Sequence, residues 1–208
     1  MQIENRLEWR KGMEELTLLG ERAVQAKYEL QRMTTEKKNE VLEAVAEALI
    51  QNTEYLLLEN HKDLERGIAN QMNPGLVDRL RLTKERIAGM AEGIRQIVKL
   101  PDPVGEILDD YEAENGLHIV KKRVPMGVIG IIYESRPNVT ADAFGLCFKS
   151  GSAVILKGGS DAIHSNTAIV NCIREALKAC GITEDAIQLI QDTSRETAAE
   201  FMKLNRYV

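Results

Sequence analysis

Short apolar runs alternate with helical stretches from Gly127 onward, and this alternation constrains the fold more than any other feature of the chain. Residues 128–133, 153–156 and 186–190 are mostly apolar runs, a pattern typical of strands that are buried on both faces. A predicted helix follows each run. The first covers residues 140–149, the second begins at Ser160-Asp161 and is closed by Gly181, and the third begins at Ser194. Such alternation requires crossover connections, so we predict an α/β fold with a parallel, doubly wound, Rossmann-like sheet.

The first hundred residues follow a helical period instead. Apolar side chains fall on one helix face at residues 41–49 and again at residues 87–98. Thr83 followed by Glu85 is typical of a capped helix start, and the Pro-Asp-Pro triplet at 101–103 of a helix end. We therefore predict a helical N-terminal part over residues 1–103. The charged runs at 36–43 and 79–86 are interpreted as solvated helix faces rather than binding patches.

Residues 104–125 predict a β-hairpin between these two parts. Asn115-Gly116 is the strongest short signal for a hairpin turn, and runs with Ile and Val flank it. The faces of both strands mix charged and apolar residues, so the hairpin cannot be buried on both sides, and a lone hairpin is only marginally stable. We expect it to contact another subunit. Residues 126–208 form the α/β part, and Tyr207-Val208 is predicted to begin a further strand.

Charge and cysteine usage exclude several classes of partner. The formal net charge is −5 and the densest basic run, Lys121-Lys122-Arg123, is only three residues long, so we expect neither nucleic acid nor an anionic membrane as a partner. No apolar run approaches the roughly 20 residues that span a bilayer, and residues 1–10 do not resemble a signal peptide. The three cysteines form no CxxC pair, which indicates reduced thiols and a cytoplasmic protein.

The loops after the three predicted strands are the candidate site, because ligands of open parallel sheets bind at the carboxyl ends of the strands. These loops are residues 134–140, 157–161 and 191–194, and each leads into a helix N-terminus, which favours an anion. Lys157-Gly158-Gly159-Ser160 combines a cation, two residues that permit close backbone approach and a hydroxyl, so it suits a phosphate. The alternative is that the glycines only make the turn, Ser160 only caps the helix and Lys157 is solvated. The usual GxGxxG dinucleotide motif is absent.

Two residues of the first loop allow both a functional and a structural interpretation. Arg136 could clamp a carboxylate or phosphate, or could form an ion pair with Glu134 or Asp142. Asn138 could donate its amide to a developing oxyanion, or could satisfy local backbone groups.

Neither a nucleophile nor a metal site is indicated by the cysteines and histidines. Cys147, Cys172 and Cys180 all fall in predicted helices, where cysteines are more often small buried residues. The three histidines, His61, His118 and His164, show no metal-ligand spacing, so we predict no metal.

Residues 124–140, with the sequence Val-Pro-Met-Gly-Val-Ile-Gly-Ile-Ile-Tyr-Glu-Ser-Arg-Pro-Asn-Val-Thr, strongly resemble the signature of the γ-glutamyl phosphate reductases. The likeness extends to residues 75–80, 100–105, 149–151, 155–160 and 192–197, so it covers essentially the whole chain. That family has the aldehyde dehydrogenase fold, which implies a cofactor domain, a catalytic domain and a projecting hairpin used in oligomerisation. Residues 104–125 match this hairpin and imply a homo-oligomer. Residues 1–103 and 126–208 would then belong to an incomplete NADP-binding domain, with the catalytic domain absent.

The resemblance also implies roles for single residues. Lys157 matches the lysine that contacts the adenosine ribose or its 2′-phosphate in relatives, and with Gly158, Gly159 and Ser160 it forms the expected cofactor site. Because Ser160 stands where an acid often holds the ribose of NAD, the expected cofactor is NADPH. Glu134 and Ser194 are further cofactor candidates, Arg136 is a substrate candidate, and Asn138 resembles the asparagine that stabilises the oxyanion.

The reaction that the resemblance implies is the reduction of L-glutamyl 5-phosphate to glutamate 5-semialdehyde in proline biosynthesis. A cysteine thiolate would displace phosphate to give a thioester, which hydride from NADPH then reduces. The nucleophilic cysteine of the family lies beyond Val208, so we expect a fragment of a longer protein. Two alternatives remain: an acyl-phosphate reductase for another substrate class, and a non-catalytic nucleotide-binding or assembly protein.

Overall fold

The computed structural model describes the backbone of residues 2–208 and the side chains of residues 12–208. The chain begins with α1 (Gln2–Leu30), α2 (Thr35–Gln51), α3 (Thr53–Ala69), α4 (Pro74–Leu80) and α5 (Lys84–Lys99). The hairpin strands β1 (Ile107–Glu112) and β2 (His118–Lys122) follow. The remainder comprises β3 (Val128–Ile132), α6 (Asn138–Lys149), β4 (Ala153–Lys157), the 3-10 turn η1 (Ser160–Ala162), α7 (Ile163–Ala179), the 3-10 turn η2 (Glu184–Ala186), β5 (Ile187–Leu189) and α8 (Arg195–Phe201). No helix in this described part is long and apolar enough to cross a bilayer.

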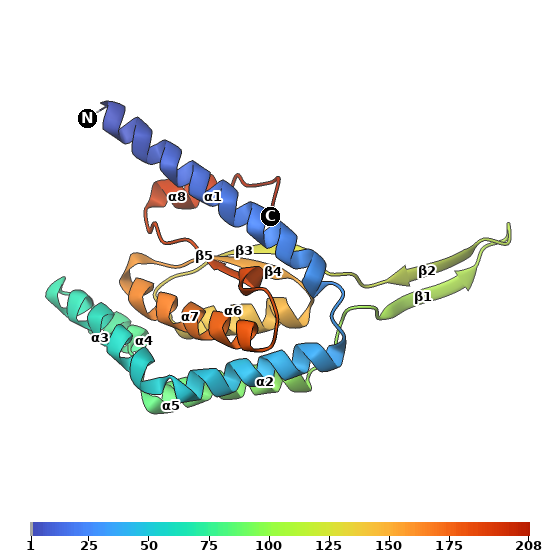
Figure 1. Ribbon diagram of the computed structural model, residues 1–208, viewed down its shortest axis with the longest axis horizontal. Coiled ribbons are helices and arrows are strands. Elements are labelled where there is room, and N and C mark those ends of the chain that lie inside the picture. The colour runs from blue at the N-terminus through green and yellow to red at the C-terminus, as the bar shows by residue number, and fades with distance from the viewer. Residues whose placement is uncertain (1) are drawn as a thin grey trace.

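The α/β part forms the predicted parallel sheet, with strand order β3-β4-β5. Helices α6 and α7 connect successive strands and lie together on one face, while α1 and α8 lie on the other (Figure 1). Helices therefore cover both faces, as a doubly wound sheet requires. Within the described strands the order follows the sequence without reversing, so both crossover helices lie on one face and α1 covers the other.

One hydrophobic core joins the two halves of the chain. It extends from Leu16 in α1 to Leu204 after α8, and includes the predicted apolar faces of α2 and α5. Helix α5 begins and ends as predicted: Thr83 caps it by accepting a hydrogen bond from the Arg86 backbone N–H, and the helix ends at Lys99 before the Pro-Asp-Pro triplet. The helices are thus part of the same packed unit as the sheet.

The expectation that residues 36–43 form a wholly solvated face is wrong for Lys38. Its side chain is only 1% exposed, and its ammonium lies 2.8 Å from the Asp102 carboxylate. Burial works to raise the pKa of Asp102, but hydrogen bonds from Lys38, Val104 and Thr35 lower it below its ordinary value. This ion pair fixes the chain at the point where the helical half gives way to the hairpin.

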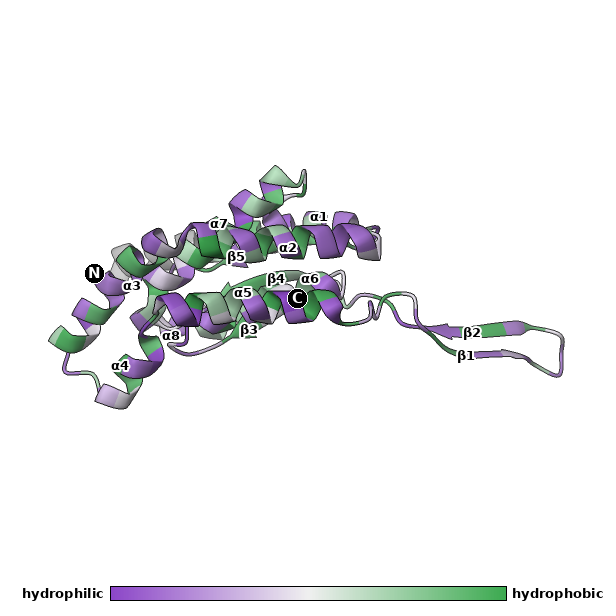
Figure 2. Ribbon diagram, turned by 90° about the horizontal axis from the view of Figure 1, so that it is seen from below, coloured by the Kyte–Doolittle hydropathy of each residue, from purple (hydrophilic) through white to green (hydrophobic). Residues whose placement is uncertain are grey.

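The hairpin projects from the body of the molecule (Figures 1 and 2). Strands β1 and β2 pair antiparallel, and Gly116 adopts the φ of +79° that the turn needs. Apart from the half-buried Ile119, every strand residue is exposed, and the exposed large apolar side chains are Ile107, Leu108, Tyr111 and Val120. The predicted hairpin and its turn are therefore confirmed.

The predicted strand at Tyr207-Val208 is wrong. Tyr207 lies in a turn and Val208 lies in no strand, and the backbone N–H groups of both donate to the Leu204 carbonyl. The Tyr207 ring packs instead on Gly20 of α1, where a Cβ atom would come within 2.6 Å of the ring. Packing against α1 therefore takes the place of sheet pairing.

Candidate functional site

The first two strand-end loops are held against each other at the edge of the sheet. The Ser135 hydroxyl donates to the Asp161 carboxylate over 2.9 Å, which joins the loop after β3 to η1 after β4. A Cβ atom at Gly159 would lie 3.5 Å from the Ser135 hydroxyl and 3.7 Å from the Glu134 carbonyl carbon. The structure therefore brings Glu134 and Gly159 together, and the Glu134 side chain is exposed there.

Gly158 is required by close packing. A Cβ atom there would lie 2.4 Å from the side-chain nitrogen of Asn166 and 3.4 Å from the Tyr133 ring. Asn166 is fully buried, its oxygen accepts a hydrogen bond from Thr140, and Thr140 in turn bonds the Tyr133 hydroxyl over 2.7 Å. Burial raises the pKa of Tyr133 to about 12, although the bond to Thr140 acts in the opposite direction. This network fixes the floor beneath the glycine turn.

Lys157 is buried, so the alternative of a solvated lysine is wrong. It is the last residue of β4 and only 4% exposed. Burial lowers the pKa of Lys157, and the nearby carboxylate of Asp192, in the loop after β5, works to raise it. Asp192 also accepts hydrogen bonds from the Ser194 backbone N–H and hydroxyl, at 2.8 and 3.1 Å. The charge of Asp192, from the third loop, thus acts on the buried Lys157 at the start of the second loop.

Ser194 caps α8, as predicted, by accepting a hydrogen bond of 3.2 Å from the Thr197 backbone N–H. Ser160 does not cap α7. The N-cap of α7 is Ala162, and η1 intervenes between Ser160 and the helix, leaving the Ser160 side chain exposed. The expectation that Ser160 opens this helix directly is therefore wrong by one 3-10 turn.

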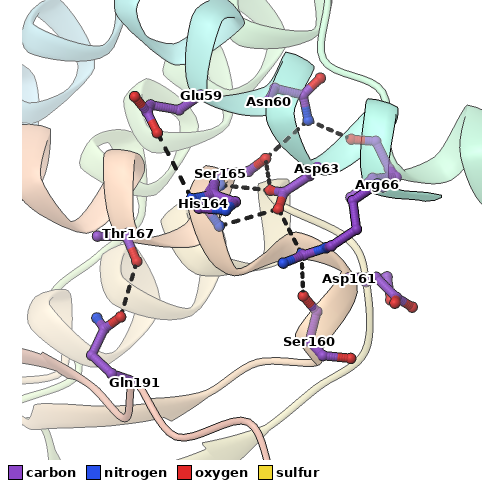
Figure 3. Close-up of polar contacts among 12 residues, drawn as sticks. Glu59, Asn60, Asp63, Arg66, Ser160, Asp161, His164, Ser165, Thr167 and Gln191 are labelled. Carbon is purple, nitrogen blue, oxygen red and sulfur yellow. Dashed lines mark hydrogen bonds and ion pairs between the residues drawn. The ribbon is translucent and has the colours of Figure 1, made fainter. Parts of the chain in front are cut away.

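The carboxylate of Asp63, from α3, fills the N-terminus of α7 instead (Figure 3). It accepts from the backbone N–H groups of His164 and Ser165, at 3.3 and 2.7 Å, and from the Ser165 hydroxyl at 2.6 Å. The Arg66 guanidinium lies 2.9 Å from Asp63 and donates to the Ser160 carbonyl over 2.5 Å. The helix dipole that was expected to attract a phosphate is already matched to an internal carboxylate.

Arg136 and Asn138 lie apart from this cluster, in an open cavity of about 460 Å³. Its walls come from the start of α6 and from the α4–α5 segment; they include Asp78, Arg79, Arg81, Arg86, Pro137 and Asp142. The Asn138 amide donates to Asp142 over 3.1 Å, and burial raises the pKa of Asp142 although that bond opposes the shift. Among residues 12–208, Arg136 forms neither of the two ion pairs considered above.

Residues 10–207 match the aldehyde dehydrogenase family. This chain belongs to the aldehyde dehydrogenase family. The oxidoreductases of this family use a nicotinamide cofactor, so the edge of the β3-β4-β5 sheet is its candidate cofactor site.

Two similar members of the family share a name. The γ-glutamyl phosphate reductases of Clostridium botulinum (strain Eklund 17B / Type B) and Anoxybacillus flavithermus are 52% and 50% identical to this chain over 196 residues. The match covers 94% of this chain and 47% and 48% of those proteins, so the chain spans about half the length of these relatives. The crystal structure of γ-glutamyl phosphate reductase from Thermotoga maritima superposes with a TM-score of 0.91 and 41% identity, over 93% of this chain and 47% of that one.

Two of the three cysteines lie within helices, as predicted, and Cys180 is the C-cap residue of α7. Cys147 and Cys172 are buried in α6 and α7, and burial raises the pKa of each thiol to about 11. Cys180, at the end of α7, is partly buried, and burial raises its pKa as well. None of the three is an activated thiolate near neutral pH. Among residues 12–208, no three His, Cys, Asp or Glu side chains are grouped to hold a metal ion.

Sequence reasoning missed Asp63, Arg66 and the three cavity arginines of the α4–α5 segment, whereas Arg136 was already a candidate. Asp63 and Arg66 are spaced like an ordinary surface ion pair of a helix, and nothing local indicates that Asp63 meets residues 101 and 102 positions away. In sequence, residues 79–86 resemble one solvated helix face. In the structure they span a break between two helices, because α4 ends at Leu80 and α5 begins only at Lys84. The break between two helices was the one local signal that these side chains would converge.

Proposed function

We propose that this chain forms the cofactor-binding half of an NADPH-dependent reductase that converts L-glutamyl 5-phosphate to L-glutamate 5-semialdehyde and phosphate, in the biosynthesis of proline. The observation that carries the proposal is the identity of 50 to 52% to proteins named γ-glutamyl phosphate reductase, over 94% of the chain. The reaction acts on a small acyl phosphate in the cytoplasm.

We assign the cofactor to Lys157, Gly158, Gly159 and Ser160, with Glu134 and Ser194 at the neighbouring strand ends. When bound there, NADPH would supply the hydride. The fit rests on Gly159, which is partly exposed at the sheet edge and carries no side chain, and on the exposed Ser160 hydroxyl beside it; Gly158 lets the turn pack on Asn166 and Tyr133. Because Asp63 occupies the α7 N-terminus, recognition of a 2′-phosphate depends on Lys157 and Ser160 without the helix dipole.

We assign substrate binding to Arg136 and stabilisation of the developing oxyanion to the Asn138 amide. Asn138 is exposed at the mouth of the cavity, where its amide can exchange Asp142 for a substrate oxygen. The nucleophilic thiol is supplied by a cysteine other than the three in this chain, since their raised pKa values disfavour the thiolate. The 208 residues alone should then leave NADPH absorbance unchanged with glutamyl phosphate; turnover that Cys147→Ala abolishes would contradict this.

Binding titrations of NADPH and NADH to the full-length protein test the cofactor assignment. We expect Lys157→Met, which preserves much of the buried apolar volume, to weaken NADPH binding about tenfold and NADH binding much less, because only NADPH carries the 2′-phosphate. Lys178→Met is the matched control, since Lys178 is half-exposed on α7 and pairs with Glu175 and Glu184. Equal losses for both cofactors would show that Lys157 does not recognise the 2′-phosphate.

We propose the domain roles that the sequence predicts. Residues 1–103 and 126–208 build the cofactor domain, and residues 104–125 join subunits of a homo-oligomer. The exposed apolar side chains of β1 and β2 support this role, because water would otherwise cover them. Leu108→Lys with Val120→Lys should lower the mass measured by light scattering, whereas Glu114→Lys in the turn should not. An unchanged mass in the double variant would refute the assignment.

A further inference from the structure

The cavity beside Asn138 concentrates positive charge from two distant parts of the sequence. Arg79, Arg81 and Arg86 come from the α4–α5 segment, and Arg136 comes from the loop after β3. The only carboxylates in its wall are Asp78 and Asp142. These residues converge although Arg136 lies 50 to 57 positions beyond the three other arginines, so the arrangement is a product of the fold rather than of a local charged run.

The carboxylates of the wall are already engaged. Asp78 accepts from the Arg86 guanidinium with both oxygens, at 3.0 and 3.1 Å, and so neutralises that arginine. Asp142 accepts from Asn138, and burial raises its pKa, which opposes a full negative charge at this position. The guanidinium groups of Arg79, Arg81 and Arg136 therefore have no ion-pair or hydrogen-bond partner among residues 12–208.

Three unpaired like charges around one cavity repel one another and contribute nothing to folding. Guanidinium groups present a planar fork of N–H donors that matches a carboxylate or phosphate bidentately. A cavity of about 460 Å³ accommodates a metabolite of the size of a phosphorylated amino acid. An anion on a small molecule is therefore the ligand that this charge pattern fits.

We infer that Arg79, Arg81 and Arg136 form an anion clamp that holds an oxyanion group of the substrate while its acyl carbon lies at Asn138. The inference rests on the proposed function and deepens it, because it assigns two arginines of the α4–α5 segment to substrate recognition. Asn138 lines the same cavity, so a substrate held by the clamp presents its carbonyl to that amide. The clamp makes the enzyme selective for acyl groups that carry a second negative charge.

The reverse reaction of the full-length protein separates the two possible sources of this anion. In that direction glutamate 5-semialdehyde is oxidised, NADP⁺ is reduced and inorganic phosphate enters the acyl phosphate, so the semialdehyde brings the α-carboxylate and phosphate is a separate reactant. We expect Arg79→Gln, Arg81→Gln and the double variant to raise one of the two KM values about tenfold or more, with the KM for NADP⁺ unchanged. A higher KM for the semialdehyde assigns the clamp to the carboxylate, and a higher KM for phosphate assigns it to the phosphoryl group.

Arg95→Gln provides the matched control, because Arg95 lies on α5 outside the cavity and pairs with Glu43 and Glu47. Calorimetric titration of wild type and double variant with L-glutamate and with inorganic phosphate gives a readout independent of turnover, and thermal unfolding checks that the variants remain folded. The clamp is refuted if both KM values and both anion affinities are the same in the double variant as in Arg95→Gln. Absence of semialdehyde oxidation in the wild-type protein would instead refute the proposed function.

Discussion

Replacing Asp63 with alanine should destabilise the chain more than any change to a surface ion pair. Asp63 is completely buried, and its carboxylate accepts hydrogen bonds from two backbone N–H groups, the Ser165 hydroxyl and Arg66. Its removal leaves the first turn of α7 without a cap and the Arg66 guanidinium without its counter-ion. Asn60 would also be affected, since it donates to the same Ser165 hydroxyl over 2.9 Å while bonding the α4–α5 segment (Figure 3).

The expected loss follows from these contacts. Removing one partner of a buried charged pair typically costs about 3–5 kcal/mol, and the loss of an N-cap costs about 0.5–2 kcal/mol. These costs overlap here, because the same oxygens make both kinds of contact. The Arg66 side chain is 39% exposed, so water can solvate its charge once Asp63 is gone. We therefore expect a decrease of about 3 kcal/mol in the free energy of unfolding, near the lower end of the range for buried pairs.

Urea unfolding followed by circular dichroism measures this change. With a slope of about 2 kcal/mol per molar urea, the midpoint should fall by about 1.5 M. Asp78→Ala is the matched control: Asp78 also pairs with an arginine, but its side chain is 68% exposed, so its loss should cost less than about 1 kcal/mol. If Asp63→Ala lowered stability by no more than Asp78→Ala, the α7 N-terminus would not depend on this carboxylate, and the reason for excluding a phosphate there would fail.

Two further predictions concern the floor of the glycine turn. Gly158→Ala should lower stability by about 1–3 kcal/mol, because the added Cβ would stand 2.4 Å from the Asn166 side-chain nitrogen. The double variant Gly158→Ala with Asn166→Ala should regain part of this stability, as measured by thermal unfolding. No gain would show that the added Cβ clashes with something other than Asn166. Because the pKa of Tyr133 is raised to about 12, the folded state favours the neutral phenol, so its contribution to stability is complete below pH 10 and falls as the pH rises towards 12. Urea unfolding at pH 9 and 11 should show a smaller decrease for Tyr133→Phe than for the wild type, and an equal decrease would refute the assignment.

The sequence predicted the elements of the fold because their signals are local. The apolar runs at β3, β4 and β5, the Asn115-Gly116 turn and the Thr83 cap each lie within a few residues of what they determine. Predictions failed where long-range packing decided the outcome. Tyr207 packs on Gly20 instead of entering a strand, and Lys38 is drawn out of a charged run by Asp102, more than sixty residues away.

In the candidate site, too, local signals were predicted and long-range contacts were not. The sequence placed three loops at one sheet edge. The structure joins the first two through the hydrogen bond between Ser135 and Asp161, and the charge of Asp192 in the third acts on Lys157 of the second. The sequence could not indicate that neighbouring residues of the loop after β3 face two different sites. Ser135 ties the loop to the glycine turn, whereas Arg136 and Asn138 line the cavity formed with the α4–α5 segment.

This two-sided loop has a consequence for the proposed chemistry. Hydride transfer requires the cofactor and the acyl carbon to meet, and consecutive residues of a single short loop contact both of their proposed sites. The loop is held at both ends, by Tyr133 through its bond to Thr140 and by Pro137, which is buried. A change that loosens the Ser135 to Asp161 bond should therefore disturb the Asn138 side as well as the cofactor side. We expect the two proposed sites to be coupled by the backbone between them, because the same short loop positions residues of both.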